Sequence, residues 1–375
     1  MSDTRKTTKP NVPNLRFPGF SGEWELKRID EISPLQRGFD LPSQSLQVGS
    51  VPVVYSNGIM NYHNESKCVA PGIVTGRSGT IGRLTYIESG PYWPHNTSLW
   101  VTDFKGNIPL FVYYLLEHID LSRFSSGSGV PTLNRNDVHA FKTCIPSVEE
   151  QHKIADCLSI IDKRISIQNK VIEDLKKLKT ALEERMLGQC QGKQVRLRDI
   201  LIERVEKSRI NNQYEVLSST VSGIYSQREY FNKEIASADN TGYKTIHRRD
   251  VVLSPQNLWM GNINYNDRFE IGIVSPSYKV FSIDEKFDKG YIAFLLKTRK
   301  ALWAYSLVSE QGASIVRRNL NYESFLEISF VIPSLKEQQA TARRLSAFKQ
   351  KQTMEEAFLR SLLLQKEFML KTLFI

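Results

Sequence analysis

The chain has few cysteines, and their positions form no pattern. Its four cysteines are Cys68, Cys144, Cys157 and Cys190, with neither CxxC spacing nor a nearby histidine pattern. This spacing argues against a zinc site and against a disulfide framework. The six histidines are also scattered without metal-ligand spacing. We therefore expect ordinary reduced thiols and no metal ion in this chain.

The sequence also lacks the motifs of common enzyme classes. It contains no Walker A motif, no HExxH, no GxSxG, no Pro-Asp pair of a metal nuclease and no Asn-Pro-Pro or Asp-Pro-Pro stretch of an amino-methyltransferase. No apolar run is long enough to span a membrane, and the polar opening MSDTRKTTKPNVP has no signal-peptide core. We expect a cytoplasmic protein without a membrane segment and without a catalytic site of its own.

What the chain has in excess is positive charge. Its 375 residues include 50 Lys+Arg against 40 Asp+Glu, a formal net charge of +10. Such a balance favours a polyanionic partner without proving one. The hydrophobic content of 41% is ordinary for a folded protein, and the length favours two or three domains.

One stretch of the sequence occurs twice. Ile145-Pro146-Ser147 recurs as Ile332-Pro333-Ser334, and Glu150-Gln151 recurs as Glu337-Gln338, both at an offset of 187. Each copy contains Pro-Ser-x-x-Glu, a capping-box pattern that predicts the start of a helix. Upstream segments match at smaller offsets, so the chain is interpreted as two copies of one unit in which the helices match well and the bodies have diverged.

A heptad pattern follows each predicted helix start. Apolar residues recur in a 4-3 rhythm, with Gln168 and Lys179 filling gaps in the first copy and Gln352 and Glu355 in the second. A helix of about 40 residues is about 60 Å long, too long for an ordinary surface helix. The pattern predicts two spacer helices that pair as an antiparallel coiled coil. The predicted seam consists of Ile154, Leu158, Ile161, Ile165, Ile172, Leu175, Leu182, Leu345, Phe348, Leu359, Leu362 and Met369.

The two bodies mix short β-rich runs with one helical stretch each. This pattern predicts an α+β fold, with two tandem α/β domains separated by the two long helices in a pseudo-twofold repeat. The predicted segments are a flexible N-terminus at 1–13, a first domain at 14–143, a central spacer helix at 144–190, a second domain at 191–331 and a C-terminal spacer helix at 332–375.

Three loops in each body are rich in Arg, Asn, Gln, Ser and Thr interleaved with aromatic residues, the groups that contact nucleic acid. The glycine-rich run 76–83 lacks phosphate-loop spacing, so a hairpin turn is favoured there. Arginine pairs also occur at 248–249 and 317–318. Ordinary turns share this composition. The candidate DNA-binding residues are Arg37, Asn57, Arg77, Ser78, Thr80, Arg83, Asn96, Ser128, Thr132, Arg135, Tyr225, Gln227, Arg228, Gln256, Asn257, Asn262, Gln311, Arg317 and Arg318.

Three segments resemble the specificity subunit of type I restriction-modification systems. They are NLRFPGFSGEWELKRIDEI at 14–32, the run at 135–155 and its echo at 332–345, and the resemblance extends from about residue 14 to the end. It implies two target recognition domains, each reading half of a split site in double-stranded DNA, and spacer helices that dock two methyltransferase (modification) subunits. It also implies S-adenosylmethionine in the methyltransferase subunits, and ATP and Mg in motor-nuclease (restriction) subunits, with no cofactor in this chain.

Two alternatives use the same residues differently. A single-chain DNA methyltransferase or nuclease would act on DNA unaided, whereas a coiled-coil protein scaffold would show no DNA preference and no salt-dependent binding. The second helix is less regular than the first, so partner docking there is expected to be asymmetric. The apolar tail LLLQKEFMLKTLFI is expected to pack on the first helix or on a partner.

Overall fold

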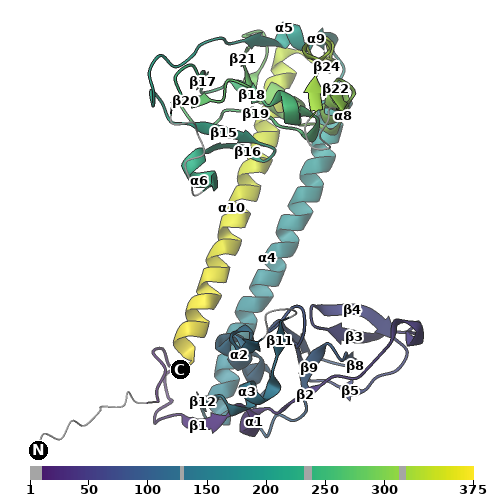
Figure 1. Cartoon of the computed structure of the whole chain (residues 1–375), viewed down its shortest axis with the longest axis vertical. Helices are drawn as coiled ribbons and strands as arrows, with labels where there is room; N and C mark the ends of the chain where they lie inside the picture. Colours follow the sequence, from purple (N-terminus) through teal and green to yellow (C-terminus); the bar gives the residue numbers. More distant parts are fainter. Residues whose placement is uncertain (1–10, 127–130, 232–238, 312–317) are drawn as a thin grey trace, which may run out of the picture. The chain divides into compact units, whose positions relative to one another are not determined.

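The computed structural model describes residues 11–126, 131–231, 239–311 and 318–375. It divides into two compact units, residues 1–169 with 357–375 and residues 170–356. Both units contain helices and sheets, so the α+β class is confirmed. Two long helices, α4 (Val148–Gly188) and α10 (Leu335–Leu373), run through both units (Figure 1). About half of each helix belongs to the first unit and the other half to the second.

The first unit contains a body built on two four-stranded sheets. The first sheet has the order β2 (Leu35–Arg37), β9 (Ser98–Val101), β6 (Gly72–Gly76), β7 (Leu84–Ile87), and the second has the order β4 (Gly58–His63), β3 (Val51–Tyr55), β8 (Pro91–Pro94), β5 (Cys68–Val69). The remaining elements are the pair β1 (Glu25–Arg28) and β12 (Lys142–Ile145), the hairpin β10 (Ser125–Ser126) and β11 (Thr132–Leu133), helices α1 (Ile29–Ile32), α2 (Pro109–Ile119) and α3 (Arg135–Ala140), and the 3₁₀ turns η1 (Ser43–Ser45) and η2 (Leu121–Phe124).

The second unit has one four-stranded sheet in the order β14 (Leu201–Glu203), β21 (Lys279–Ile283), β18 (Val251–Leu253), β19 (Ile263–Tyr265). Its two-stranded pairs are β13 (Lys193–Arg196) with β24 (Ser329–Ile332), β15 (Leu217–Thr220) with β16 (Gly223–Ser226), β17 (Lys244–His247) with β20 (Ile271–Val274), and β22 (Ser309–Gln311) with β23 (Arg318–Leu320). Its shorter helices are α5 (Leu197–Ile200), α6 (Gln227–Phe231), α7 (Lys289–Leu295), α8 (Arg299–Leu307) and α9 (Tyr322–Glu327), with the 3₁₀ turn η3 (Pro255–Met260).

The internal repeat is visible in the strand pairs that open and close each body. β1 pairs antiparallel with β12, and β13 pairs in the same way with β24. β1 leads directly into the four-residue helix α1, and β13 leads directly into the four-residue helix α5. The Ile29 amide donates to Phe141 (3.0 Å), and the Leu197 amide donates to Ile328 (2.8 Å). The bodies diverge in their outer strands, because the first has a second four-stranded sheet where the second has separate strand pairs.

The two long helices start differently. At α10, Ser334 Oγ accepts from the Glu337 amide (3.4 Å) and the Glu337 carboxylate accepts from the Ser334 amide (3.1 Å), a complete capping box. At α4, Ser147 Oγ accepts from the Glu150 amide at 3.5 Å. The Glu150 carboxylate instead accepts two hydrogen bonds of 2.8 Å from Arg16. The capping box predicted for the first helix is therefore only half formed, because Arg16 binds the carboxylate that would complete it.

The predicted seam residues lie on the less exposed side of both helices. In the first unit, Leu158 of α4 and Leu373 of α10 share one core, and in the second unit Leu187 of α4 and Leu345 of α10 share another. Each unit thus pairs the early part of one helix with the late part of the other, which is an antiparallel arrangement. Phe374 also stacks on Phe111 of α2, with ring centroids 5.5 Å apart.

The tail that follows the seam belongs to the core of the first unit. Leu373 and Phe374 are each 2% exposed, and they share that core with Ile154 of α4. The end of the tail thus packs against the first helix in this core as expected, whereas Leu363, Leu364 and Phe368 of the same tail are 48%, 66% and 60% exposed. No helix in the described part of the chain is long and apolar enough to cross a membrane.

Candidate nucleic-acid interface

In the first unit, four of the predicted DNA-binding residues line one open pocket of about 420 Å³. They are Arg37 of β2, Arg77 from the turn after β6, Thr132 of β11 and Arg135 of α3. The pocket thus joins residues from three segments that are far apart in the sequence. Its three guanidinium groups provide donors with the geometry that suits phosphate oxygens and guanine edges.

Backbone hydrogen bonds fix the turn that carries Arg77. The amides of Arg77 and Ser78 both donate to Thr97 (3.0 and 3.2 Å), and the Arg77 carbonyl accepts from Leu133 (2.8 Å). Gly76 is required here, because a Cβ at this position would lie 1.7 Å from the Thr80 carbonyl oxygen. The run 76–83 connects the antiparallel strands β6 and β7, so the predicted hairpin is confirmed and the phosphate-loop reading is excluded.

The other predicted residues of this body lie on this hairpin, in the turn between β3 and β4, and between β8 and β9. Thr80 and Arg83 are exposed on it, and Asn57 is exposed in the turn between β3 and β4. Asn96 donates to Asp40, which also pairs with Arg37 at 3.2 Å. Arg37 and Asn96 therefore share one carboxylate, which orients both side chains. Ser128 lies outside the described residues.

The second unit has a related cluster at η3 and the hairpin β22–β23. The Arg318 guanidinium stacks over the Trp259 ring at 4.2 Å. Within the described part of the chain, Arg318 Nε and Asn257 Oδ1 are buried polar atoms without a hydrogen-bond partner. Gln311 pairs with Arg318 across the hairpin, and Gln256 is exposed on η3. Buried polar groups are normally satisfied, so the two unsatisfied atoms mark a place for a ligand group or for water. Arg317 lies outside the described residues.

One predicted contact is wrong. Asn262 is 4% exposed, and its side chain donates to the Ser219 carbonyl (2.9 Å) and accepts from Ser219 Oγ (2.7 Å). Asn264 donates to the same Oγ at 2.7 Å. These bonds tie β19 to β15, so Asn262 has a structural role and no free group for DNA.

Three further predicted residues lie on β16 and α6. Tyr225 and Gln227 are partly buried and Arg228 is exposed. Gln227 Oε1 is another buried acceptor without a hydrogen-bond partner in the described part of the chain. These three residues are not part of the cluster at η3, and their role as DNA contacts stays a prediction.

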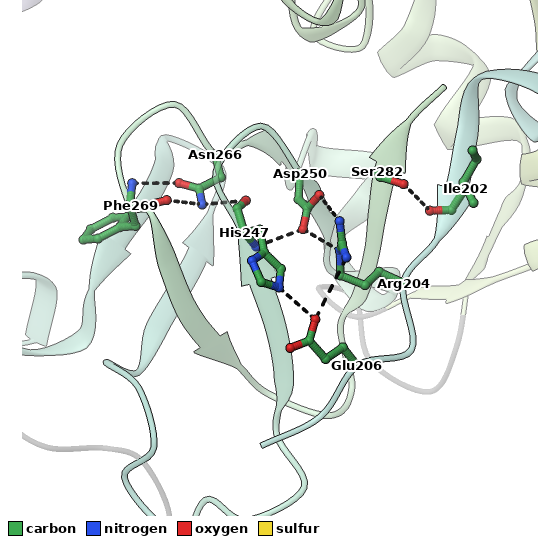
Figure 2. A network of polar contacts seen from close by, with 8 residues as sticks. All are labelled: Ile202, Arg204, Glu206, His247, Asp250, Asn266, Phe269 and Ser282. Atoms are coloured by element: carbon green, nitrogen blue, oxygen red, sulfur yellow. Dashed lines mark hydrogen bonds and ion pairs between the residues drawn. The ribbon is translucent and has the colours of Figure 1, made fainter. Parts of the chain in front are cut away.

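The arginine turn at 247–250 is held by the polar network of Figure 2. Asp250 accepts from Arg204 (2.9 and 3.2 Å) and from the His247 amide (2.8 Å), while His247 Nε2 lies 2.8 Å from Glu206. Asn266 donates to the His247 carbonyl at 2.9 Å. This turn precedes β18 whereas η3 follows it, so its arginines lie at the other end of the strand from the Arg318 cluster.

The network also holds an unusual backbone conformation. Arg249 has a φ of 74°, a left-handed conformation that a side chain of this size rarely adopts. The turn is closed by the Asp250 amide, which donates to the His247 carbonyl at 3.1 Å. The buried Asp250 carboxylate and the Asn266 side chain hold both sides of the turn. We attribute the persistence of the strained residue to these two clamps.

Sequence reasoning missed three residues of the two clusters. Asn134 and Asn136 line the pocket of the first body, and Trp259 supports Arg318 in the second. Asn134 also caps α3 by accepting from the Asn136 amide at 3.0 Å. The Leu-Asn pair at 133–134 recurs at 320–321 before a short helix in each body, but this repeat does not by itself indicate a pocket wall. Among the described residues, no three His, Cys, Asp or Glu side chains are grouped so as to hold a metal ion.

Comparison with known proteins finds one family model that matches part of the chain. Residues 21–177 match the model of the type I restriction modification DNA specificity domain. No curated protein matches the chain. The S subunit of a type I restriction-modification system from M. genitalium is similar in structure, with 16% identity, a TM-score of 0.64, and coverage of 97% of this chain and 99% of that one.

A second solved structure has a similar fold over the same extent. It comes from work on complex assembly and conformational transition of the type I R-M system, with 11% identity, a TM-score of 0.54, and coverage of 96% of this chain and 98% of that one. The family match covers the first body with most of α4, and the repeat described above gives the second body the same opening and closing elements. The chain thus has the fold of the solved S subunit, and its residues 21–177 match the type I restriction modification DNA specificity domain.

Proposed function

We propose that this chain is the non-catalytic, sequence-reading subunit of a type I restriction-modification complex, and that each body reads one half of a split site in double-stranded DNA. The observation that carries the proposal is the repeated position of the polar clusters. In both units, the segment that follows the strand β6 or β18 meets a hairpin, β10–β11 or β22–β23, and arginine and amide groups collect there.

The two clusters differ in the groups they present. The first has Arg37, Arg77 and Arg135, whereas the second has Arg318 on Trp259 beside Asn257. Bidentate arginine favours guanine, and amide side chains favour adenine. Different half sequences for the two bodies therefore follow from their side chains. Because both must approach one face of the duplex, we propose half sites on the order of one helical turn apart, about 34–36 Å.

The long helices carry a second apolar face in addition to the seam. On α4, Ile160, Ile167 and Leu178 are 57%, 64% and 48% exposed. On α10, Met354 and Phe358 are 67% and 44% exposed, and they occupy the positions that Ile167 and Val171 occupy in the first copy. Apolar residues repeated at this spacing on an exposed helix favour contact with another protein.

We assign this second apolar face to the methyltransferase subunits. In this proposal two such subunits dock on the helices and use S-adenosylmethionine, and restriction subunits that use ATP and Mg complete a complex in the cytoplasm. The chain itself supplies sequence recognition and spacing, and no step of the methyl transfer.

Adenine methylation in cells that carry this chain and its partner subunits tests the proposal. We expect methylation at one two-part motif with a constant gap, no methylation when the chain is absent, and no turnover of DNA by the purified chain alone. A chain that methylates or cleaves DNA unaided would establish the single-chain enzyme instead. If the partner subunits methylate the same motif when the chain is absent, the result would favour the coiled-coil scaffold.

A further inference from the structure

One lysine occurs at the same place in both long helices, but the charged residues around it differ between the two units. Lys366 of α10 occupies the position that Lys179 occupies in α4, at the repeat offset of 187. In the first unit, the Lys366 ammonium lies 2.9 Å from carboxylate oxygens of both Glu117 and Asp162. Its side chain is 14% exposed, and Tyr114 donates to Asp162 at 2.8 Å.

This arrangement is electrostatically complete. Burial lowers the pKa of Lys366, but the hydrogen bonds and charges of Asp162 and Glu117 outweigh that effect, so that its pKa is raised. Two carboxylates on one ammonium leave no demand for a further anion. The helix pair in the first unit is therefore closed by residues of this chain.

In the second unit the equivalent positions are basic. Lys297 takes the place of Glu117 and Lys349 takes the place of Asp162. Lys349 lies 2.8 Å from Asp267, and Lys179 lies 3.5 Å from Glu183. Lys297 donates only to the backbone carbonyls of Val221 (3.3 Å) and Gly261 (2.9 Å), with no carboxylate in ion-pair range among the described residues.

These lysines line a groove of about 1030 Å³ in the second unit. The hairpin β15–β16, which lies beside α10 in Figure 1, forms one wall. Helix α7, the two long helices and residues 264–268, at β19 and just after it, form the others. Ile224, Phe294 and Met354 add apolar surface. Partial burial lowers the pKa of Lys297 to about 8, the result expected for an ammonium that has lost water without gaining a carboxylate.

We propose that this lysine groove, formed by Lys179, Lys297 and Lys349 with Ile224, Phe294 and Met354, docks an acidic and partly apolar segment of one methyltransferase subunit. The inference rests on the proposed function, because it assumes that this subunit binds the helices. A carboxylate beside an apolar side chain satisfies both walls of the groove, whereas a DNA phosphate leaves the apolar wall without a partner. In the first unit the same places are closed by the ion pairs of Lys366, so the two methyltransferase copies are held differently.

The test measures binding of the purified methyltransferase subunit to the full-length chain by sedimentation and native mass spectrometry. We expect two copies on the wild-type chain, and weaker binding of one copy, about tenfold or more, for Lys297→Met and for Lys349→Gln. The matched controls Lys300→Met and Lys351→Gln remove a lysine at neighbouring positions outside the groove and should retain both copies. Lys349→Arg keeps the charge and should retain the second copy.

The outcomes separate the inference from the proposed function. A wild-type chain that binds no methyltransferase subunit contradicts both. Two copies bound with unchanged affinity by the groove variants, with thermal unfolding also unchanged, overturn the inference alone. Weaker binding of duplex DNA by the chain without partners, with methyltransferase binding unchanged, also overturns it and assigns the groove to DNA.

Discussion

Gln151 and Ile108 are joined by a hydrogen bond that recurs in the second half of the chain. The Ile108 amide donates to Gln151 Oε1 at 3.0 Å, and the Asp288 amide donates to Gln338 Oε1 at 2.9 Å. Each glutamine also donates from Nε2 to a proline carbonyl at the start of its own helix, Pro146 at 3.1 Å or Pro333 at 2.9 Å. The repeated glutamine thus fastens each long helix to the start of a helix in its body, α2 or α7.

Gln151→Ala and Gln338→Ala are expected to destabilise the protein by about 1–3 kcal/mol each, because each leaves two buried backbone groups without partners. The side chains are only 1% and 2% exposed, so water cannot replace them easily. Urea unfolding of the two variants measures this loss. Gln365→Ala, at an exposed position of α10, is the matched control and should unfold like the wild type. An equal effect of all three substitutions contradicts the anchoring role.

Arg16→Gln is expected to cost about 3 kcal/mol, since it leaves the Glu150 carboxylate, 2% exposed, without its counter-ion. Arg28→Gln removes a more exposed pair with Asp30, where the two side chains are 46% and 32% exposed, and should cost far less. The double variant Arg16→Gln with Glu150→Gln should regain part of the stability. A double-mutant cycle by urea unfolding checks the coupling, and a coupling energy near zero argues against it.

Arg77→Ala is expected to weaken recognition by about 1–3 kcal/mol and to relax only the half site read by the first body. Arg318→Ala should relax only the other half. Methylation mapping with each variant in the assembled complex gives both results. If either substitution changes both halves, or if both change the same half, the assignment of one cluster to each half site is wrong.

Mild acid is expected to loosen the C-terminal end of α10. His118 stacks on Phe374 with ring centroids 5.1 Å apart, and burial lowers its pKa below the ordinary value of 6.5 despite hydrogen bonds to the backbone of Leu370 and Ile375. The unfolded chain then binds more protons than the folded one, so stability falls as the pH drops below about 6.5 and through the lowered pKa.

His118→Phe keeps the stack and removes the titration. Between pH 7.5 and 5.5, this variant is therefore expected to lose less free energy of unfolding than the wild type. Urea unfolding of both proteins at each pH measures the difference. His95 and His139 also have lowered pKa values and remain in both proteins, so the comparison isolates His118. Identical pH profiles for the two proteins would show that His118 is not titrated on unfolding.

Local patterns predicted the parts of the fold that depend on local interactions. Helix starts at the repeated Pro-Ser motifs, the heptad seam and the hairpin at 76–83 all follow from spacing and turn chemistry within a few residues. The Arg16–Glu150 pair could not be predicted, because it joins residues 134 positions apart. Only the folded chain shows that the Glu150 carboxylate binds Arg16 of the N-terminal segment and does not complete the helix cap.

The candidate site was predicted as residue types but not as an arrangement. Arg77 lies in the turn after β6 and Arg135 at the start of α3. The hydrogen bond from Leu133 to Arg77 and the bridge between Ser78 and Thr132 bring the two segments together. Asparagine is common in turns, yet the side-chain amide of Asn262 is hydrogen-bonded to Ser219. A sequence cannot distinguish an exposed amide from a satisfied one when the partner lies on a distant strand.

The most direct measurement maps methylated adenines after residues 14–143 are exchanged for the first body of another family member with a different target. The account predicts that one half of the two-part motif changes, while the other half and the gap between them stay the same. A motif that changes in both halves, or in its gap alone, would contradict the claim that two independent readers are held at a spacing set by the paired helices.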